Sequence, residues 1–217
     1  MNDAFFFPVQ LSLKIAFVSL IIVFILGILL AKFMVNKKFK GKIIAETIIL
    51  LPLVLPPTVI GFLLIMVFGN TSPISNLIEW LFSQPVMFTW WAGVIASTVV
   101  ALPLMYQSAK TGFSTIDPAI EEAARVDGAG EWRVFFLVTM PLAYHSLISG
   151  AILSFARALG EFGATLMFAG NIPGKTQTMS TAIYMSIESG NMELAWLLVT
   201  TMIIISFFML LAASRFR

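Results

Sequence analysis

The chain has 217 residues, of which 59% are hydrophobic and only 11% are charged. Soluble domains average roughly 45–50% apolar and about 25% charged residues, so this composition predicts an integral membrane protein. The absence of cysteine excludes disulfides, thiolate nucleophiles and cysteine-ligated metals. A net charge of +2 says little about partners by itself, and we expect no nucleic acid among them.

Five stretches are apolar enough to cross a bilayer, for which a helix needs about 20 residues. A broken stretch, 141–169, carries a charged pair. The others are unbroken apolar runs, at about 9–31, 43–68, 86–106 and 194–213. We expect an all-α polytopic membrane protein with about five transmembrane helices, folded as one domain over residues 1–217. An odd number of spans places the two termini on opposite sides of the membrane.

Basic residues gather in alternate connecting segments, and this pattern predicts the orientation of the chain. Segments 1–8, 69–85 and 170–193 hold only Lys175. By the positive-inside rule, the N-terminus lies outside, whereas the polar loop after the third span and the C-terminus are cytoplasmic. The first span is expected to be retained and not cleaved as a signal peptide, because its lysines follow it. The basic residues of the other segments are Lys32, Lys37, Lys38, Lys40, Lys42, Lys110, Arg125, Arg133, Arg215 and Arg217.

The segment 117–141 is a polar, Ala-rich stretch inside this apolar chain, and its ends carry helix signals. Asp117 is placed as a helix cap, and Pro118 suits the first helical position. Glu121 and Glu122 complement the positive end of the helix dipole, and Gly128 can end the helix. The pattern predicts a short helix exposed to water.

The spacing of this segment resembles a family motif. Glu122-Ala123-Ala124 is followed after three residues by Gly128, and after nine more by the sequence 138–141, Val-x-Met-Pro. It resembles the EAA loop of ABC importer permeases, although Val and Met replace the usual Ile and Leu. The resemblance implies a coupling loop over about 111–140 whose helix docks on a separate ATPase subunit; the alternative is an ordinary surface helix. The coupling residues it implies are Glu122, Ala123, Ala124, Arg125, Asp127 and Gly128.

Prolines and one charged pair mark the membrane segments. Proline removes a backbone donor and kinks a helix, so the spans that hold Pro52, Pro56, Pro57 and Pro103 should pack against other helices. These bends either form the wall of a pathway or serve packing alone.

Arg157 and Glu161 lie one helical turn apart at membrane depth, where a charge is costly unless it is paired or faces a cavity. They form either a structural ion pair or part of an anion pathway or gate. If the role is structural, reversing both residues together should restore a function that either single change abolishes.

The sequence around this pair narrows the resemblance. The runs Gly-Glu-Phe-Gly-Ala at 160–164 and Gly-Asn-Ile-Pro-Gly-Lys-Thr at 170–176 are similar to the permease subunit of molybdate ABC importers, in a group that also imports sulfate and tungstate. The glycines permit close helix contact and a local break. We take as candidates for the pathway or gate Arg157, Gly160, Glu161, Phe162 and Gly163.

Enzymatic alternatives find little support in the sequence. Gly174-Lys175-Thr176 resembles the end of a phosphate-binding loop, but the motif needs glycine where Ala169 stands. His145 and Ser146 are adjacent and should point to different helix faces, so we expect His145 to be an interfacial or packing residue. We expect no catalytic residue, metal site or ATP site in this chain.

The resemblance implies a transport subunit that moves an oxyanion inward, most simply molybdate. It implies a homodimer surrounded by lipid, a nucleotide-binding subunit that holds ATP and Mg²⁺, and an extracytoplasmic solute-binding protein. The alternatives are a sulfate or tungstate importer or, from a different class, an ion channel. A passive channel has no reason to retain the Glu-Ala-Ala loop.

Overall fold

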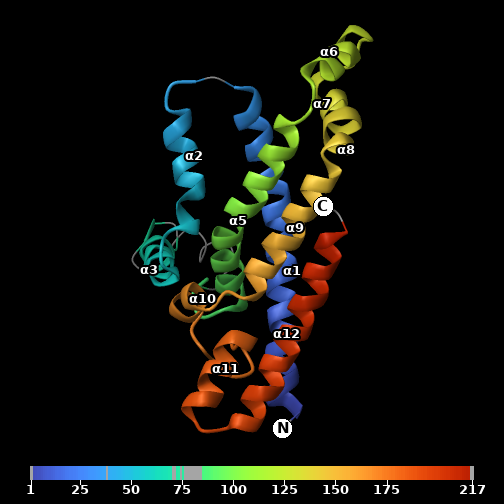
Figure 1. Cartoon of the computed structure of the whole chain (residues 1–217). Coiled ribbons are helices and arrows are strands. Elements are labelled where there is room, and N and C mark those ends of the chain that lie inside the picture. The colour runs from blue at the N-terminus through green and yellow to red at the C-terminus, as the bar shows by residue number, and fades with distance from the viewer. Residues whose placement is uncertain (1, 38, 70–71, 74, 76–84, 216–217) are drawn as a thin grey trace.

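The computed structural model describes residues 2–37, 39–69, 72–73, 75 and 85–215. Within these ranges the chain is helical, with no strand. Four helices form the main bundle and lie side by side (Figure 1). They are α1 (Asn2–Asn36), α5 (Trp90–Ser114), α9 (Tyr144–Leu159) and α12 (Met192–Ser214).

Three described helices, α1, α5 and α12, are each long and apolar enough to cross a membrane alone. Two further spans are bent: α2 (Lys42–Leu50) with the 3₁₀ turn Leu51–Leu53 meets α3 (Pro57–Phe68) at 113°. The segment Glu131–Leu142 meets α9 at 75°. The five predicted spans are present if each bent pair is counted as one span.

Prolines cause the first of these bends. Pro52 lies in the 3₁₀ turn, Pro56 precedes α3 and Pro57 is its first residue, so α2 cannot continue in its original direction. Pro103, by contrast, is buried inside α5, which remains one helix from end to end. The third span therefore has no break at this proline, although the sequence predicted a bend. Packing against neighbouring helices holds α5 together.

The third span is also longer than predicted. It was expected to end near Tyr106, but α5 continues to Ser114. Glu46 of α2 forms a 2.8 Å ion pair with Lys110 and accepts a 3.3 Å hydrogen bond from the Tyr106 hydroxyl. Because the Lys110 charge is paired, it does not end the helix, and the coupling loop begins at Thr115.

Two short helices that the sequence analysis did not predict follow α9, one at the end of the broken stretch 141–169 and one in the connecting segment 170–193. They are α10 (Gly163–Phe168) and α11 (Met179–Glu188). Thr178 and Thr181 form a capping box at the start of α11, with reciprocal side-chain to backbone hydrogen bonds. Both helices lie toward the end of the bundle that holds the N-terminus (Figure 1).

Small residues let the main helices approach one another closely. A Cβ added at Gly27 of α1 would lie 2.7 Å from Cγ of Met105 in α5. The ammonium of Lys14 of α1 lies 4.0 Å from the ring centroid of Trp90 in α5. In α12 only Ala195 and Leu198 are buried, so most of its surface faces outward.

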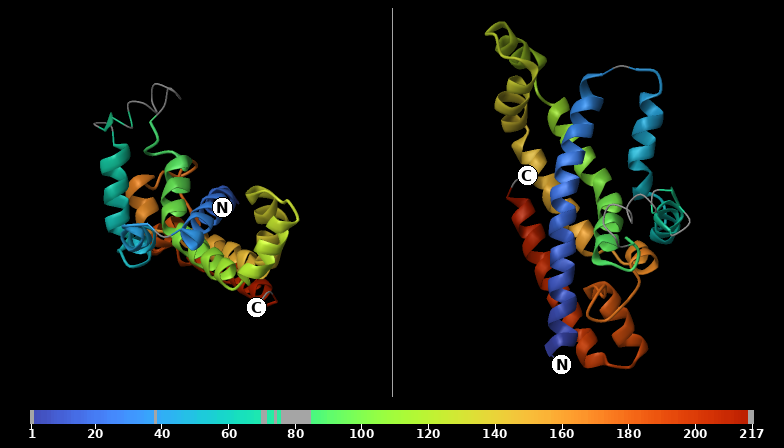
Figure 2. Two further views of the ribbon diagram at one scale, coloured as in Figure 1. Left: turned by 90° about the horizontal axis from the view of Figure 1, so that it is seen from above. Right: turned by 180° about the vertical axis from the view of Figure 1, so that it is seen from behind.

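The short helix α6 (Pro118–Val126) and the N-terminus lie at opposite ends of the molecule (Figures 1 and 2). Lys38, Arg217 and most of the predicted connecting segment 69–85 lie outside the described residues.

Candidate functional site: the coupling helix, its base and the break after α9

Helix α6 begins as the sequence predicted. The Asp117 side chain accepts a 3.0 Å hydrogen bond from the Ala119 N–H, and Pro118 is the first helical residue. Glu121 lies in the first turn, where its charge complements the helix dipole.

The end of α6 depends on a glycine. Gly128 has φ +87°, and its N–H donates to the Arg125 carbonyl while the Ala129 N–H donates to the Ala124 carbonyl. These two bonds form a Schellman motif. A Cβ on Gly128 would meet no atom within 4 Å, so the backbone angle alone requires glycine.

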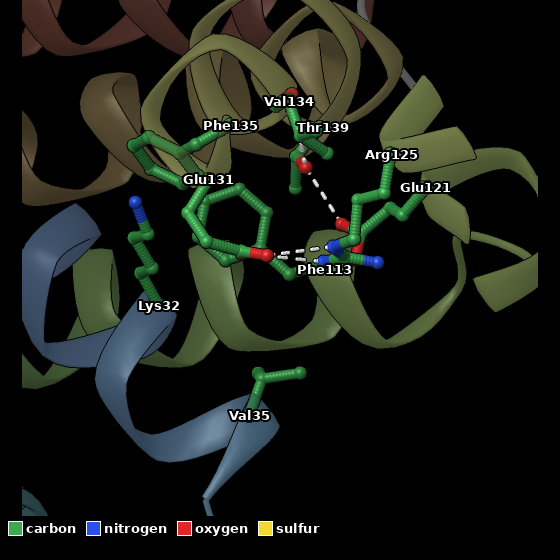
Figure 3. Close-up of a pocket in the computed structure, with 9 residues that line it drawn as sticks. All are labelled: Lys32, Val35, Phe113, Glu121, Arg125, Glu131, Val134, Phe135 and Thr139. Carbon is green, nitrogen blue, oxygen red and sulfur yellow. Dashed lines mark hydrogen bonds and ion pairs between the residues drawn. The ribbon is translucent and has the colours of Figure 1, made fainter. Parts of the chain in front are cut away.

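The base of α6 is held by a polar network (Figure 3). Arg125 donates from Nε to Glu131 at 2.7 Å and from Nη2 to Glu121 at 3.3 Å. The hydroxyl of Thr139 donates to the other oxygen of Glu121 at 2.6 Å. The hydrogen bond to Glu131 raises the pKa of Arg125, so its charge is secured at any physiological pH. The network joins α6 to α7 (Glu131–Val134) and to the π-helical turn Phe135–Thr139.

A cation on α1 completes this base. The Lys32 ammonium lies 3.8 Å from the ring centroid of Trp132 and 3.9 Å from that of Phe135. The network and these rings surround a cavity of only about 20 Å³, which is close to the volume needed for one water. The base of α6 therefore connects α1 with the loop by direct contacts and has no room for a small-molecule ligand. We call it the coupling-helix base, consisting of Lys32, Glu121, Arg125, Glu131, Trp132, Phe135 and Thr139.

The outer surface of α6 is exposed and partly apolar. Of the predicted coupling residues, Glu122, Ala123, Asp127 and Gly128 are exposed, whereas Ala124 and Arg125 are half-buried against the base. Ile120 and Val126 flank Ala123 at three-residue intervals, and Val126 is 87% exposed. Apolar side chains gathered on an exposed helix face mark an interaction site.

The predicted pair Arg157 and Glu161 is present at the end of α9. Nη1 of Arg157 lies 2.7 Å from Oε2 of Glu161, whose side chain is only 1% exposed. Oε1 of Glu161 accepts a 2.8 Å hydrogen bond from the Ala164 N–H in the first turn of α10. One buried carboxylate thus joins the last turn of α9 to the start of α10.

The other gate candidates surround this break. A Cβ on Gly163 would lie 2.9 Å from Cβ of Pro57, so α10 and α3 meet where only glycine fits without a shift. The ring of Phe162 lies 5.6 Å from that of Tyr184. Gly160 has no such constraint, because the nearest atom to an added Cβ is 3.5 Å away. Gly160 makes no close helix contact, but it lies at the end of α9, where the glycines were expected to permit a local break.

The structure does not bring the two candidate groups together. The coupling-helix base precedes α9 in the chain, and the Arg157–Glu161 pair lies at the end of α9. Helix α9 therefore runs from one group to the other.

A polar groove between α5 and α9 was not predicted. It includes His145 and Ser146, which line the same cavity although they were expected to point to different faces. They share the cavity because it is wide, and because α9 begins at Tyr144, directly before them. The polar positions Gln107, Ser108 and Thr111 of α5 face the same groove. Their spacing just after the predicted end of the third span marks a polar face of α5, but it does not indicate the partner helix across the groove.

The Gly-Lys-Thr sequence resembling a phosphate loop is a compact turn in the structure. The N–H groups of Lys175 and Thr176 both donate to the Ile172 carbonyl, at 3.0 and 2.9 Å. They point into their own turn and do not form an open anion cradle. Among the described residues, no group of three or more His, Asp or Glu side chains could hold a metal ion.

Comparison with known proteins places these features in a family. The chain is 62% identical over 206 residues to YvgM of Bacillus subtilis (strain 168), assigned as a molybdenum transport system permease, covering 95% of this chain and 91% of YvgM. It is 41% identical over 182 residues to the molybdenum transport system permease protein ModB of Escherichia coli (strain K12), covering 83% and 79%.

The fold is similar to that of a chain in a solved bacterial ABC transporter involved in the import of alginate. The TM-score is 0.77 at 18% identity, covering 99% of this chain and 79% of that one. Residues 23–216 match the family described as "Binding-protein-dependent transport system inner membrane component". The chain therefore belongs to this family of inner-membrane transport subunits.

Proposed function

We propose that this chain is the membrane-spanning subunit of an ATP-driven importer that moves a tetrahedral oxyanion, molybdate, into the cell. The observation that carries the proposal is the exposed helix α6, held rigidly by the coupling-helix base and presenting Ile120, Ala123 and Val126 to solvent. The choice of molybdate rests on the high identity to YvgM and to the E. coli permease.

The docking partner of α6 is a separate ATPase subunit. The small side chain of Ala123 lets a partner surface come close to the helix backbone. Glu122 and Asp127 add negative charges beside the apolar face that fix the orientation of docking. The base converts a movement of the ATPase into a displacement of α7, of the π-helical turn and of α1, which carry Glu131, Thr139 and Lys32.

The chain obtains its energy from that partner. ATP and Mg²⁺ are bound by the ATPase, and this chain contributes no nucleotide site of its own. Two copies related by a twofold axis enclose the pathway and present two α6 helices to two ATPase subunits. An extracytoplasmic binding protein delivers the oxyanion to the end of the bundle that holds the N-terminus, while α6 and the C-terminus are cytoplasmic.

The break after α9 serves as a hinge of the gate. Glu161 links the end of α9 to the start of α10, and Gly163 allows α10 to lie against Pro57 of α3. Nucleotide binding shifts the population between two packings of these segments, and hydrolysis resets the inward-facing one.

The test is uptake of labelled molybdate into vesicles that contain this chain with its ATPase, in the presence of the binding protein. Uptake should require ATP, the ATPase and the binding protein together. Uptake without the ATPase would establish an ion channel instead. A second measurement decides whether the importer carries molybdate, sulfate or tungstate. Sulfate and tungstate are tested as competitors of molybdate uptake, and binding of each anion to the binding protein is measured in parallel.

A further inference from the structure

The groove between α5 and α9 is an open cavity lined by six polar side chains together with Leu104 and Leu153. Its volume is about 460 Å³, within the range of roughly 300–1,000 Å³ that small-ligand sites occupy. The polar side chains that line it are Gln107, Ser108, Thr111, His145, Ser146 and Ser149.

These side chains are not suited to contact with lipid. Gln107, Thr111 and His145 are exposed on helices that cross the membrane. Gln107 and Thr111 follow the predicted end of the third span, and His145 was expected to be an interfacial or packing residue, so these polar groups lie toward the α6 end of the two helices, where water reaches them. The lipid-facing surface has a different character, as Phe207 and Phe208 of α12 show with 60% and 63% exposure. The groove is therefore an aqueous surface.

The chemistry of the groove suits an anion. Its lining contains no carboxylate, and its side chains offer hydroxyl, amide and imidazole hydrogen-bond donors. The nearest lysine on α5, Lys110, is engaged by Glu46 at 2.8 Å, so its charge is already compensated. Neutral donors hold an ion loosely, and a pathway must bind its substrate weakly enough to release it.

The groove is also connected to the coupling loop. A Cβ on Gly150 would lie 2.6 Å from Cβ of Ser108, and a Cβ on Gly112 would lie 2.6 Å from Cβ of Ser146. These close contacts hold the floor of the groove together. Its two walls, α5 and α9, are the helices that the coupling loop joins, so a displacement of α6 acts directly on the groove.

We propose that this groove is a transit site for the oxyanion at the end of the pathway nearest α6, in which neutral donors of α5 and α9 bind the dianion. The proposal rests on the importer function proposed above and adds the place and the chemistry of a substrate site. The occupant is a tetrahedral dianion.

The absence of cysteine from the chain allows a direct test. Gln107→Cys and Thr111→Cys are introduced singly into the chain assembled with its ATPase, and modification by a water-soluble thiol reagent is timed with and without saturating molybdate. Phe207→Cys on the outward face of α12 is the control for a lipid-facing position. Both groove cysteines should react at least tenfold faster than the control, and molybdate should slow them severalfold.

Two results would overturn the proposal. Groove cysteines that react as slowly as Phe207→Cys would show that lipid or protein covers the groove. Fast modification that neither molybdate nor sulfate slows would show a water-filled groove without an anion site. Because reactivity is measured without transport, failure here with intact ATP-driven uptake by the parent chain leaves the importer function standing.

A charge substitution gives a second readout that does not depend on cysteine. Gln107→Glu keeps the shape of the side chain and adds a negative charge inside the groove. Molybdate uptake should fall at least tenfold, while the folded yield of the assembled complex stays within twofold of the parent. Gln10→Glu, the same change at an exposed position of α1, is the control and should leave uptake unchanged. Equal uptake by the two variants would contradict an anion in the groove.

Discussion

The coupling-helix base and the break after α9 hold helices together in opposite ways. At the base, Arg125, Glu121, Glu131, Thr139 and Lys32 share the task through several partly exposed contacts. At the break, one buried carboxylate, that of Glu161, makes both contacts. A distributed network weakens gradually when a member is lost, whereas a single buried group fails completely. The two regions should therefore respond very differently to substitution.

The largest effect is expected from Glu161→Ala. This change removes the partner of Arg157 and leaves the Ala164 N–H without an acceptor. Breaking a buried ion pair from one side costs about 3 kcal/mol, enough to lower folded yield and abolish uptake. Yield and thermal stability in detergent measure the first effect, and vesicle uptake the second. Glu188→Ala at an exposed position of α11 is the control, and equal stability of the two variants would contradict the role of Glu161.

The structure changes what a charge reversal at the break can show. From the sequence, exchanging Arg157 and Glu161 was expected to restore function if the pair is structural. The second contact of Glu161 alters this expectation, because arginine at position 161 cannot accept the Ala164 N–H bond. We therefore expect the double reversal to remain inactive and less stable. Recovery of uptake and stability to near the parent level would show that the contact to α10 is dispensable.

At the end of α6, Gly128→Val should have the next largest effect. A β-branched residue at φ +87° is strained by about 1–3 kcal/mol and shifts the end of the helix at which we propose that the ATPase docks. ATP hydrolysis should continue while ATP-driven uptake falls at least tenfold.

Gly128→Asn is the matched comparison, since asparagine tolerates this backbone region better, and it should retain most uptake. Gly130→Ala, at φ −70°, should behave as the parent chain. Normal uptake by Gly128→Val would contradict the requirement for this helix end.

The sequence predicted local features better than tertiary ones. Asp117, Pro118 and Gly128 define α6 through backbone rules that act within a few residues, and all three take the expected positions. The Arg157–Glu161 pair was visible for the same reason, because one helical turn separates its members. The prolines at 56 and 57 likewise predicted a bend, although not its size of 113°.

Features that depend on distant segments were missed. The extension of α5 past Tyr106 depends on Glu46, sixty-four residues before Lys110. The contact of Ser108 with Gly150 likewise joins segments far apart in the chain, so α5 alone could not reveal the groove. The role of Lys32 in the coupling-helix base depends on rings that are about a hundred residues away. Periodicity within one segment carries no information about such partners.

The smallest effect should come from Thr139→Val, which keeps the size of the side chain and removes one contact of the base. The hydroxyl donates to Glu121 at 2.6 Å, but Arg125 still holds Glu121 and Glu131, and Lys32 still lies over Trp132. A hydrogen bond to a charged group contributes about 1.5–3 kcal/mol, and partial exposure places this one at the low end. Uptake should therefore fall by less than tenfold, with ATP hydrolysis unchanged.

Combining Thr139→Val with Arg125→Lys, which removes the forked contacts to both carboxylates, should reduce uptake by more than the product of the single effects. Purely multiplicative effects would show that these contacts act independently and do not form one joint.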